Sequence, residues 1–330
     1  MAKDTRKNIW VLVDDRAGNT NQAIGVAEAL GELYSLKNIC YTPRADWPNS
    51  IRGNSLLGVD RKRTDRFSPP WPDLVIAAGR KLAPVARHIK KKSGGKAKLV
   101  HIMWPGRPAG GFDLIALPQH DKRHLHSRIF RTLGAPGRVT PGVLAQAATL
   151  WQKTLEQSAP PGPYISVLLG GNTKDGEYTQ QHAYEVGRMA STAANALGGA
   201  LLVTSSRRTE EGFKRAFFNA LNAPYFYYDP EKDHANPYHA FLALSEAIIV
   251  TGDSISMCSE SCSSGKPVYI YAPEGIIPPK HRLFHAQLYK EGYARPLTME
   301  QLRQLERFSP PPQPLQAAHD IALNIKALFF

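Results

Sequence analysis

Residues 251–265 contain the residue types best suited to hold a phosphorylated ligand. An apolar run ends at the first of them, a Gly-Asp-Ser turn follows, and a helix is expected to open near Ser256. Free amides at the N-terminus of a helix and the helix dipole both favour a phosphate. Glu260 follows one turn later on the face of Ser256, where its carboxylate can accept hydrogen bonds from ribose hydroxyls. The alternative is that Asp253 and Ser254 only cap the helix and that Glu260 is a solvated surface residue.

Two other predicted strands of the second half also end in polar loops. Leu169-Gly-Gly-Asn172 follows the first strand, and its glycines let the backbone approach a ligand closely, although an ordinary glycine turn would look the same. Ser205-Ser-Arg-Arg-Thr209 follows the second strand, where the threonine suits an N-cap and the two arginines suit a phosphate. Because open α/β sheets bind ligands at the carboxyl ends of their strands, we expect one ligand to be held by Gly170, Gly171, Asn172, Ser205, Arg207, Arg208 and Thr209 together with the segment 251–265.

The first half offers candidate proton acceptors rather than phosphate ligands. Asp14 and Asp15 lie between the first predicted strand and the helix after it, where a carboxylate could act as the general base of an inverting transfer. Helix capping and loop hydrogen bonds explain them equally well. His120 is a rival base because its unperturbed pKa lies near neutrality, although lone histidines are more often structural. No Walker sequence or Rossmann fingerprint is present, and the spacing of Cys258 and Cys262 falls short of a zinc pattern.

The elements that must position these residues follow a repeated strand-helix pattern. In the first half, strands are predicted at 8–13, 38–41, 74–77, 99–102 and 114–117, with helices at 19–33 and 82–91. A second series of strands, at 164–169, 200–204, 225–228, 247–251 and 267–271, alternates with helices. The Pro-rich stretch 158–163 between the two series predicts a linker. We therefore expect two doubly wound domains, 1–157 and 158–330, that face each other across a cleft, with the last helix, 315–329, able to pack back on the first domain.

Charge is distributed unevenly along the 330 residues. Residues 1–157 carry 26 Lys and Arg against 12 Asp and Glu, whereas residues 158–330 carry 15 against 16, so the net charges are +14 and −1. The first half is expected to meet an anion: a phosphorylated substrate, an acidic membrane surface or nucleic acid. Nucleic acid ranks last because the basic residues match no known module. A basic and simply well-solvated protein is the alternative.

With no apolar run near ~20 residues, no signal segment and an odd number of cysteines, a cytoplasmic protein is expected, peripheral to the membrane at most.

Several motifs closely resemble the family named for mitochondrial fission in plants, and the resemblance runs over most of the chain. The matching stretches include Asn21-Gln-Ala-Ile-Gly, Pro72-Asp-Leu-Val-Ile-Ala-Ala-Gly-Arg, Leu169-Gly-Gly-Asn, Val203-Thr-Ser-Ser-Arg-Arg-Thr and Val250-Thr-Gly-Asp-Ser-Ile-Ser-Met-Cys-Ser-Glu. Bacterial members of this family look like GT-B glycosyltransferases. The resemblance therefore implies two Rossmann-like domains and a nucleotide-diphosphate-sugar donor.

A looser resemblance leads to the glycosyltransferase that completes the lipid-linked precursor of peptidoglycan. By that analogy Ser254, Ser256 and Met257 would present donors to the diphosphate, and Glu260 would hold the ribose. Asp253 departs from the pattern, because its negative charge would lie beside the phosphate. It could instead hold a turn amide, a sugar hydroxyl or a divalent metal.

These observations favour a glycosyltransferase that uses a nucleotide-diphosphate sugar and acts on a cell-envelope or lipid-linked acceptor. No tightly bound cofactor is expected, and a metal is not indicated. One alternative is a nucleotide-sugar 2-epimerase, which shares the architecture and needs acid and base carboxylates but no acceptor. The other is a non-enzymatic adaptor, because the family's plant members resemble proteins that recruit a dynamin-type partner.

Overall fold

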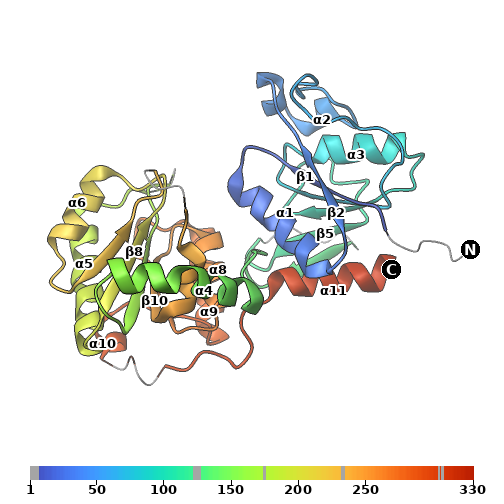
Figure 1. Cartoon of the computed structure of the whole chain (residues 1–330). Helices are drawn as coiled ribbons and strands as arrows, with labels where there is room; N and C mark the ends of the chain where they lie inside the picture. Colours follow the sequence, from blue (N-terminus) through green and yellow to red (C-terminus); the bar gives the residue numbers. More distant parts are fainter. Residues whose placement is uncertain (1–6, 122–127, 174–175, 232–234, 304, 306–307) are drawn as a thin grey trace, which may run out of the picture. The chain divides into compact units, whose positions relative to one another are not determined.

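The computed structural model describes residues 7–121, 128–173, 176–231, 235–303, 305 and 308–330, and its elements are drawn in Figure 1. The chain divides into two compact units. Unit 1 combines the N-terminal residues up to Arg138 with residues 316–330, and unit 2 comprises residues 139–315. Each unit is built on its own parallel sheet of six strands, so two Rossmann-like units are present, as the sequence predicts.

The sheet of unit 1 has the strand order β2-β1-β3-β4-β5-β6, and every neighbouring pair is parallel. Its inner strands are short apolar runs buried on both faces, as expected where helices cover both sides of a parallel sheet. The strands are β1 (Ile9–Val13), β2 (Tyr34–Asn38), β3 (Leu74–Ala78), β4 (Lys98–Ile102), β5 (Leu114–Pro118) and β6 (Ile129–Thr132).

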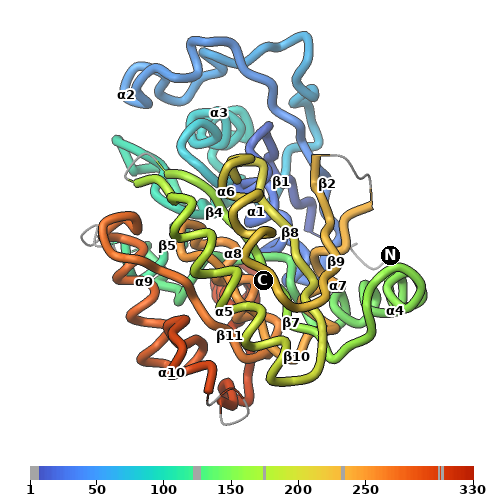
Figure 2. The backbone as a smooth tube through the Cα atoms, turned by 90° about the vertical axis from the view of Figure 1, so that its left-hand side faces the viewer, coloured from blue at the N-terminus to red at the C-terminus, as the bar shows by residue number. Residues whose placement is uncertain are grey.

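Two buried clusters cover opposite faces of this sheet. One lies under α1 (Ala17–Leu30) and α11 (Ala317–Phe329), and the other lies under α3 (Ala83–Lys92). The connection between β2 and β3 is long and irregular and holds only η1 (Pro43–Asp46) and α2 (Asn49–Arg52). Figure 2 shows this light-blue connection beside α3.

The C-terminal helix α11 completes unit 1, although more than 170 residues separate it from the rest of that unit. It packs against α1, and its residues Ile321, Ala322 and Ile325 are buried in the same cluster as Val26 and Leu30 of α1. The blue and red helices lie next to each other in Figure 1. The chain therefore passes between the units twice, after Arg138 and after Leu315.

The sheet of unit 2 has the order β12-β11-β10-β7-β8-β9 and is also parallel throughout. Its strands are β7 (Tyr164–Leu169), β8 (Ala200–Ser205), β9 (Tyr225–Tyr228), β10 (Ser245–Thr251), β11 (Val268–Tyr271) and β12 (Arg295–Pro296). Its helices are α4 (Pro141–Ser158), α5 (Gln180–Ala196), α6 (Glu211–Asn219), α7 (Tyr238–Leu244), α8 (Ile255–Ser263), α9 (Pro279–Lys290) and α10 (Met299–Leu302).

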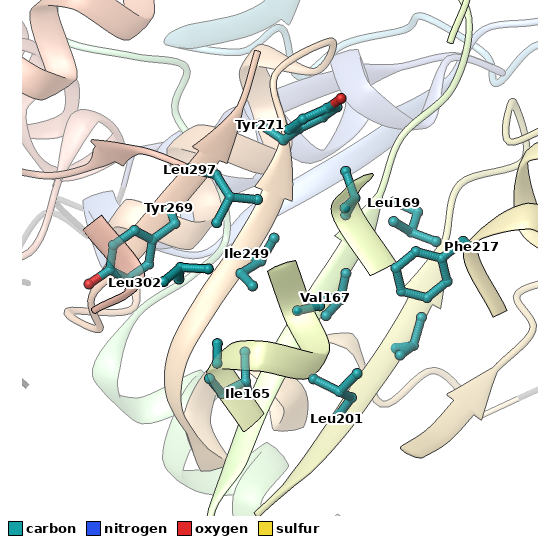
Figure 3. Packing of buried hydrophobic residues seen from close by; sticks show 14 of the residues in the cluster. Ile165, Val167, Leu169, Leu201, Phe217, Ile249, Tyr269, Tyr271, Leu297 and Leu302 are labelled. Carbon is teal, nitrogen blue, oxygen red and sulfur yellow. The ribbon is translucent and has the colours of Figure 1, made fainter. Parts of the chain in front are cut away.

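One face of this sheet carries the largest apolar cluster of unit 2. Figure 3 shows alternate residues of the central strands, such as Ile165, Val167 and Leu169 of β7, pointing to the same side. Leu297 and Leu302 from the segment after β12 pack against them. Alternate residues of a strand share a face, so this packing fixes the register of β7 and β10 and thereby the positions of the loops that follow them.

The boundary between the units differs from the one expected at residue 157. Helix α4 precedes the Pro-rich stretch, yet it belongs to unit 2, because Leu155 is buried with Leu202, Tyr228 and Phe241. Unit 1 ends instead at Arg138, whose guanidinium forms two hydrogen bonds with the carboxylate of Glu28 on α1, at 3.0 and 2.7 Å. Prolines at 160, 161 and 163 shape a loop inside unit 2 and do not mark a domain linker.

The second strand was also predicted in the wrong place. The structure has β2 at Tyr34–Asn38, before the apolar residues 39–41 that suggested a strand at 38–41. Leu36 of β2 is exposed, and the strand lies at the edge of the sheet. An edge strand exposed to solvent needs no continuous apolar run, which is why its sequence gives little signal.

Candidate functional site

The loops after β7, β8 and β10 meet at the side chain of Asp253. These three strands are neighbours in the sheet, so their carboxyl ends lie at one edge. The Asp253 carboxylate is buried and accepts hydrogen bonds from the backbone N–H of Gly171 at 3.1 Å and from the hydroxyl of Thr251 at 2.7 Å. The same threonine hydroxyl accepts the N–H of Gly170 at 2.6 Å. Of the roles expected for this aspartate, holding a turn amide is the one that the structure shows.

Arg208 connects the loop after β8 to the same carboxylate. Its guanidinium lies 3.0 Å from Asp253 and donates a second hydrogen bond to the carbonyl of Asn172, also at 3.0 Å. Burial raises the pKa of Asp253, and the hydrogen bonds from Thr251 and Gly171 and the charge of Arg208 oppose that rise. The negative charge of Asp253, which does not fit the pattern of a phosphate site, is therefore paired inside the protein.

The two glycines after β7 have a different role from the one expected. A Cβ atom on Gly170 would lie 1.9 Å from the carboxylate of Asp253, and one on Gly171 would lie 2.0 Å from the carbonyl oxygen of Arg208. The close approach that needs glycine is thus an approach between loops of the protein. It brings the strand ends together and does not by itself indicate a ligand.

Three further residues of the predicted set form internal hydrogen bonds. Thr209 donates its hydroxyl to the carbonyl oxygens of Leu169 and Gly170, at 3.1 and 2.5 Å. The amide of Asn172 bridges the backbone N–H of Tyr178 and the carboxylate of Glu210, and the hydroxyl of Ser205 pairs with Tyr227 at 2.9 Å. Helix α6 begins after Glu210, so Thr209 is not its N-cap, contrary to expectation.

The N-terminus of α8 retains free donors. Ser254 is the N-cap, and its hydroxyl accepts the N–H of Met257 at 3.3 Å. Met257 is therefore not a free backbone donor, contrary to the analogy with the peptidoglycan enzyme. Ile255 and Ser256, one and two residues after the cap, have backbone N–H groups that reach no acceptor in the described part of the chain. These two amides, with the helix dipole, form the part of this edge best suited to an anion.

Glu260 lies one turn further along α8. Its Oε2 atom accepts a hydrogen bond from the hydroxyl of Tyr238 at 2.9 Å, whereas Oε1 accepts none from the described residues. Burial raises the pKa of Glu260 to about 7, and the hydrogen bond from Tyr238 partly opposes this rise. The carboxylate is thus oriented by one partner and keeps one oxygen for another.

Arg207 differs from Arg208 in its partners. Its side chain is exposed and forms no ion pair with any residue that the structure describes. Of the two arginines in the loop after β8, one is paired with Asp253 and the other has no acidic partner among the described residues.

Sequence reasoning missed two histidines of α9. His281 lies in the first turn, where it interacts with the backbone of Gly252 and the charges of Asp253 and Arg208, and burial lowers its pKa. His285, one turn later, is buried against Gly252 and Cys258, and burial lowers its pKa to about 4. Two histidines four residues apart after a strand end were the available signal. Both cysteines of α8 are buried.

A pocket of about 380 Å³ opens beside these histidines. It lies between the end of β11 and α9, and its lining includes Tyr271, Arg282, His285, Tyr289 and Thr298. This volume falls in the range of small-molecule sites, about 300–1,000 Å³. Through His285, which lies against Gly252, the pocket adjoins the loop after β10.

Asp14 lies at the carboxyl end of β1 in unit 1. It is partly buried, and its two oxygens accept hydrogen bonds from the N–H of Arg16 and from the hydroxyl of Tyr41, both at 3.1 Å. Burial raises the pKa of Asp14, and these two hydrogen bonds oppose the rise. Asp15 is exposed. Of the two carboxylates, Asp14 is therefore the one that is partly buried and oriented by hydrogen bonds.

His120 and Asp14 follow different strands of the sheet of unit 1. It is buried in the loop after β5, and two strands, β3 and β4, separate β5 from β1. Three strand spacings correspond to about 14 Å. The two candidate bases thus follow strands that are not neighbours in the sheet.

The described residues contain no group of three His, Cys, Asp or Glu side chains arranged to hold a metal ion. None of the described helices has the length and apolar character needed to cross a membrane.

The fold defines the class of protein. Two parallel Rossmann-like units make this a GT-B fold, the architecture of nucleotide-sugar transferases and epimerases. The UDP-GlcNAc 2-epimerase of Neisseria meningitidis, solved with UDP-GlcNAc, matches with a TM-score of 0.54 and 12% identity, covering 97% of this chain and 99% of that one. The glycotransferase of kitacinnamycin matches with a TM-score of 0.53 and 13% identity, covering 99% and 100%.

The chain belongs to the Mitochondrial fission ELM1 family, whose model matches residues 17–329. An uncharacterized protein of Rickettsia prowazekii (strain Madrid E) is 33% identical over 355 aligned positions, which cover 97% of this chain and 98% of that protein. Mitochondrial fission protein ELM1 of Arabidopsis thaliana is 27% identical over 245 positions, covering 67% of this chain but only 56% of the plant protein. The family resemblance expected from the motifs is confirmed.

Proposed function

We propose that this protein is a glycosyltransferase that binds a nucleotide-diphosphate sugar on unit 2. The observation that carries the proposal is the arrangement of α8. Free amides of Ile255 and Ser256 stand one turn before Glu260, whose carboxylate is held by Tyr238 with one oxygen unpaired. A helix N-terminus suits a phosphate, and a carboxylate one turn along suits the two hydroxyls of a ribose.

The charges around α8 suit a diphosphate. Arg208 already neutralises Asp253, so the exposed Arg207 and the helix dipole supply the net positive charge. In this proposal the diphosphate binds the α8 amides and Arg207, and the pocket between β11 and α9 holds the sugar. Stabilisation of the leaving diphosphate by these fixed donors would be the main contribution to catalysis.

We assign the general base to Asp14, which would take the proton from the acceptor hydroxyl. Its pKa is raised by burial, which brings the carboxyl closer to the neutral range where a general base is most effective. His120 is the alternative base. The net charge of residues 1–157 suits an acceptor that is anionic, such as a lipid-linked phosphate at the inner face of a membrane.

The first test is isothermal titration of UDP-, GDP-, ADP- and CMP-sugars into wild type and into Glu260→Ala. Loss of one charged hydrogen bond costs about 1.5–3 kcal/mol, so the Kd of the preferred nucleotide should rise about tenfold or more. Glu246→Ala is the matched control, because this exposed glutamate stands at the amino end of β10, away from α8. If no nucleotide binds wild type at millimolar concentration, the donor site does not exist.

Product analysis separates the transferase from its relatives in fold. A transferase releases free nucleotide diphosphate only when an acceptor is present, whereas a 2-epimerase, the activity of the Neisseria meningitidis structure, converts the sugar with no acceptor at all. The adaptor alternative follows from the name of the Arabidopsis relative. A protein that binds neither nucleotide nor sugar but captures a division protein would favour the adaptor and contradict our proposal.

A further inference from the structure

Unit 1 contains a second pocket that the nucleotide-sugar site does not explain. Its volume is about 400 Å³, and its walls come from residues 56–71 and from α3. At one end Trp71 lies near the start of β1, where Asn8 donates a hydrogen bond to its carbonyl oxygen. The pocket therefore flanks the face of the sheet covered by α3 and is not the Asp14 loop at the carboxyl end of β1.

The floor of the pocket is apolar. Leu56, Val59, Phe67 and Trp71 line it, and all four pack against the buried cluster under α3. Both aromatic rings pack against Trp10. The ring centroid of Phe67 lies 6.3 Å from that of Trp10, and the ring centroid of Trp71 lies 6.0 Å from it. These side chains are held from behind by the core, so they present a fixed apolar surface to whatever enters.

The rim of the pocket is cationic. Arg61, Arg66 and Lys92 are exposed, and none of them forms an ion pair with a residue that the structure describes. The single acidic residue of the lining, Asp65, accepts hydrogen bonds from the backbone and side chain of Asn38, at 2.7 and 3.2 Å. Three cations thus line the pocket against one carboxylate, whose Oδ2 atom accepts both hydrogen bonds from Asn38.

The positive charges around the pocket affect the pKa of His88. Its pKa is lowered first by burial and then by the charges of Lys92, Arg61 and Lys91, against a hydrogen bond with the backbone of Asn54. The charged residues of the segment 56–71 that line the same pocket are Arg61, Arg66 and Asp65. An anion in the pocket would offset these positive charges.

We propose that this pocket binds a phosphate ester of an apolar chain, with the chain on the aromatic floor and the phosphate on Arg61, Arg66 and Lys92. A nucleotide fits less well, because a base needs directional partners and the Thr64 hydroxyl of the lining is already bonded to the backbone of Cys40, at 2.9 and 3.3 Å. Every residue of the pocket lies in unit 1. The inference deepens the proposed function, since such an ester has the chemistry of the anionic acceptor proposed there, but its binding tests hold whether or not unit 2 binds a nucleotide sugar.

The test titrates four probes into the full chain by calorimetry: n-octyl phosphate, inorganic phosphate, 1-octanol and uridine monophosphate. Octyl phosphate is expected to bind at least tenfold more tightly than either half alone, and also more tightly than uridine monophosphate. Equal binding of inorganic phosphate, tighter binding of the nucleotide, or no binding of octyl phosphate at millimolar concentration would each overturn the assignment.

Two double variants with the same change of charge locate the site. Arg61→Glu with Arg66→Glu should weaken octyl phosphate binding at least tenfold. Lys62→Glu with Arg63→Glu alters neighbouring exposed cations that do not line the pocket, so it should change the affinity less than twofold. Equal losses in both variants would show unspecific attraction to a basic surface and would contradict the proposal.

A measurement on the unmodified protein keeps the proposal testable if the first double variant does not fold. The imidazole resonance of His88, identified by its loss in His88→Gln, is followed against pH with and without octyl phosphate. The phosphate should raise the pKa of this histidine and shift its resonance on binding. A resonance that does not respond to saturating octyl phosphate would place the ligand outside the pocket.

Discussion

Asp253 organises the site at the residue scale. A carboxylate beside a phosphate site is unfavourable unless its charge is paired, and here it is paired with Arg208 and with the Gly171 amide. The carboxylate therefore builds the site by joining the loops after β7, β8 and β10. Residues of this kind carry no signal in a single sequence that separates them from residues that touch the ligand.

Gly170→Ala should disrupt this junction. The added methyl group would collide with the buried Asp253 carboxylate at 1.9 Å, so we expect a loss of about 2–4 kcal/mol in the free energy of unfolding and a weaker nucleotide affinity. Gly212→Ala on α6 is the control, because its methyl group meets only Gln180 at 3.7 Å and should leave stability unchanged or improved. Chemical denaturation measures both. Equal stability of the two variants would contradict the packing of Gly170 against Asp253.

Glu260→Gln should increase stability above neutral pH and weaken nucleotide binding. The folded-state pKa of Glu260, about 7, lies above its ordinary value of 4.5, so ionisation of this carboxyl opposes folding. Its unfavourable contribution grows as pH rises from about 4.5 to 7 and is complete above 7. The neutral glutamine should therefore be more stable than wild type at pH 8, on the order of 1–3 kcal/mol, and equally stable near pH 4.

The nucleotide affinity should move in the opposite direction. A ribose diol donates to the ionised carboxylate, so wild-type affinity should increase as pH rises through 7, whereas the glutamine variant should bind more weakly and show no such titration. Calorimetry between pH 6 and 8 measures this. A glutamate with a purely structural role would leave nucleotide affinity unchanged when replaced by glutamine.

At the scale of elements, the central strands could be predicted from the sequence, and most of the edge strands could not. Strands β1, β3, β7 and β10 are apolar runs covered on both faces, and they lie within a residue or two of their predicted places. The strands β2, β6 and β12 were misplaced or missed, and all three are edges of their sheets. Their side chains meet solvent or loops, so no periodic pattern is required of them.

The site was predictable only to the level of the loops that form it. Strand order brings the loops after β7, β8 and β10 together, and the sequence pointed to all three. Which polar groups remain free depends on hydrogen bonds across those loops, such as that of Arg208 to Asp253, and these follow from tertiary packing. His281 shows the same limit, since its neighbours Gly252 and Asp253 come from a different element.

The assignment of α4 to unit 2 can be tested on the helix itself. Leu155 is buried against Leu202, Tyr228 and Phe241, so Leu155→Ala should cost about 2–5 kcal/mol of unfolding free energy. Leu150 of the same helix is 75% exposed, and Leu150→Ala should change stability by less than about 0.5 kcal/mol. If α4 were a linker between domains, the two substitutions would have similarly small effects in thermal unfolding.

At the scale of the whole molecule, the division into units changes the meaning of the charge asymmetry. The net charge of +14 was counted over residues 1–157, and α4, which belongs to unit 2, contributes only one Lys and one Glu to that count. The basic character therefore belongs to unit 1, where the cationic pocket at Arg61 and Arg66 lies. Unit 2, with the candidate donor site, is close to neutral apart from local charges.

The return of α11 to unit 1 leads to the prediction that tests the architecture as a whole. Ile325 is fully buried in the cluster under α1, so Ile325→Ala should destabilise unit 1 by about 2–5 kcal/mol. Leu328 of the same helix is 55% exposed, and Leu328→Ala serves as the control. Native-state hydrogen exchange should show faster exchange in β1 and β3 of the Ile325 variant, with β7 and β10 unchanged, because each sheet has its own core. If the C-terminal helix instead packed on the second unit, the Ile325 variant would lose protection in β7 and β10.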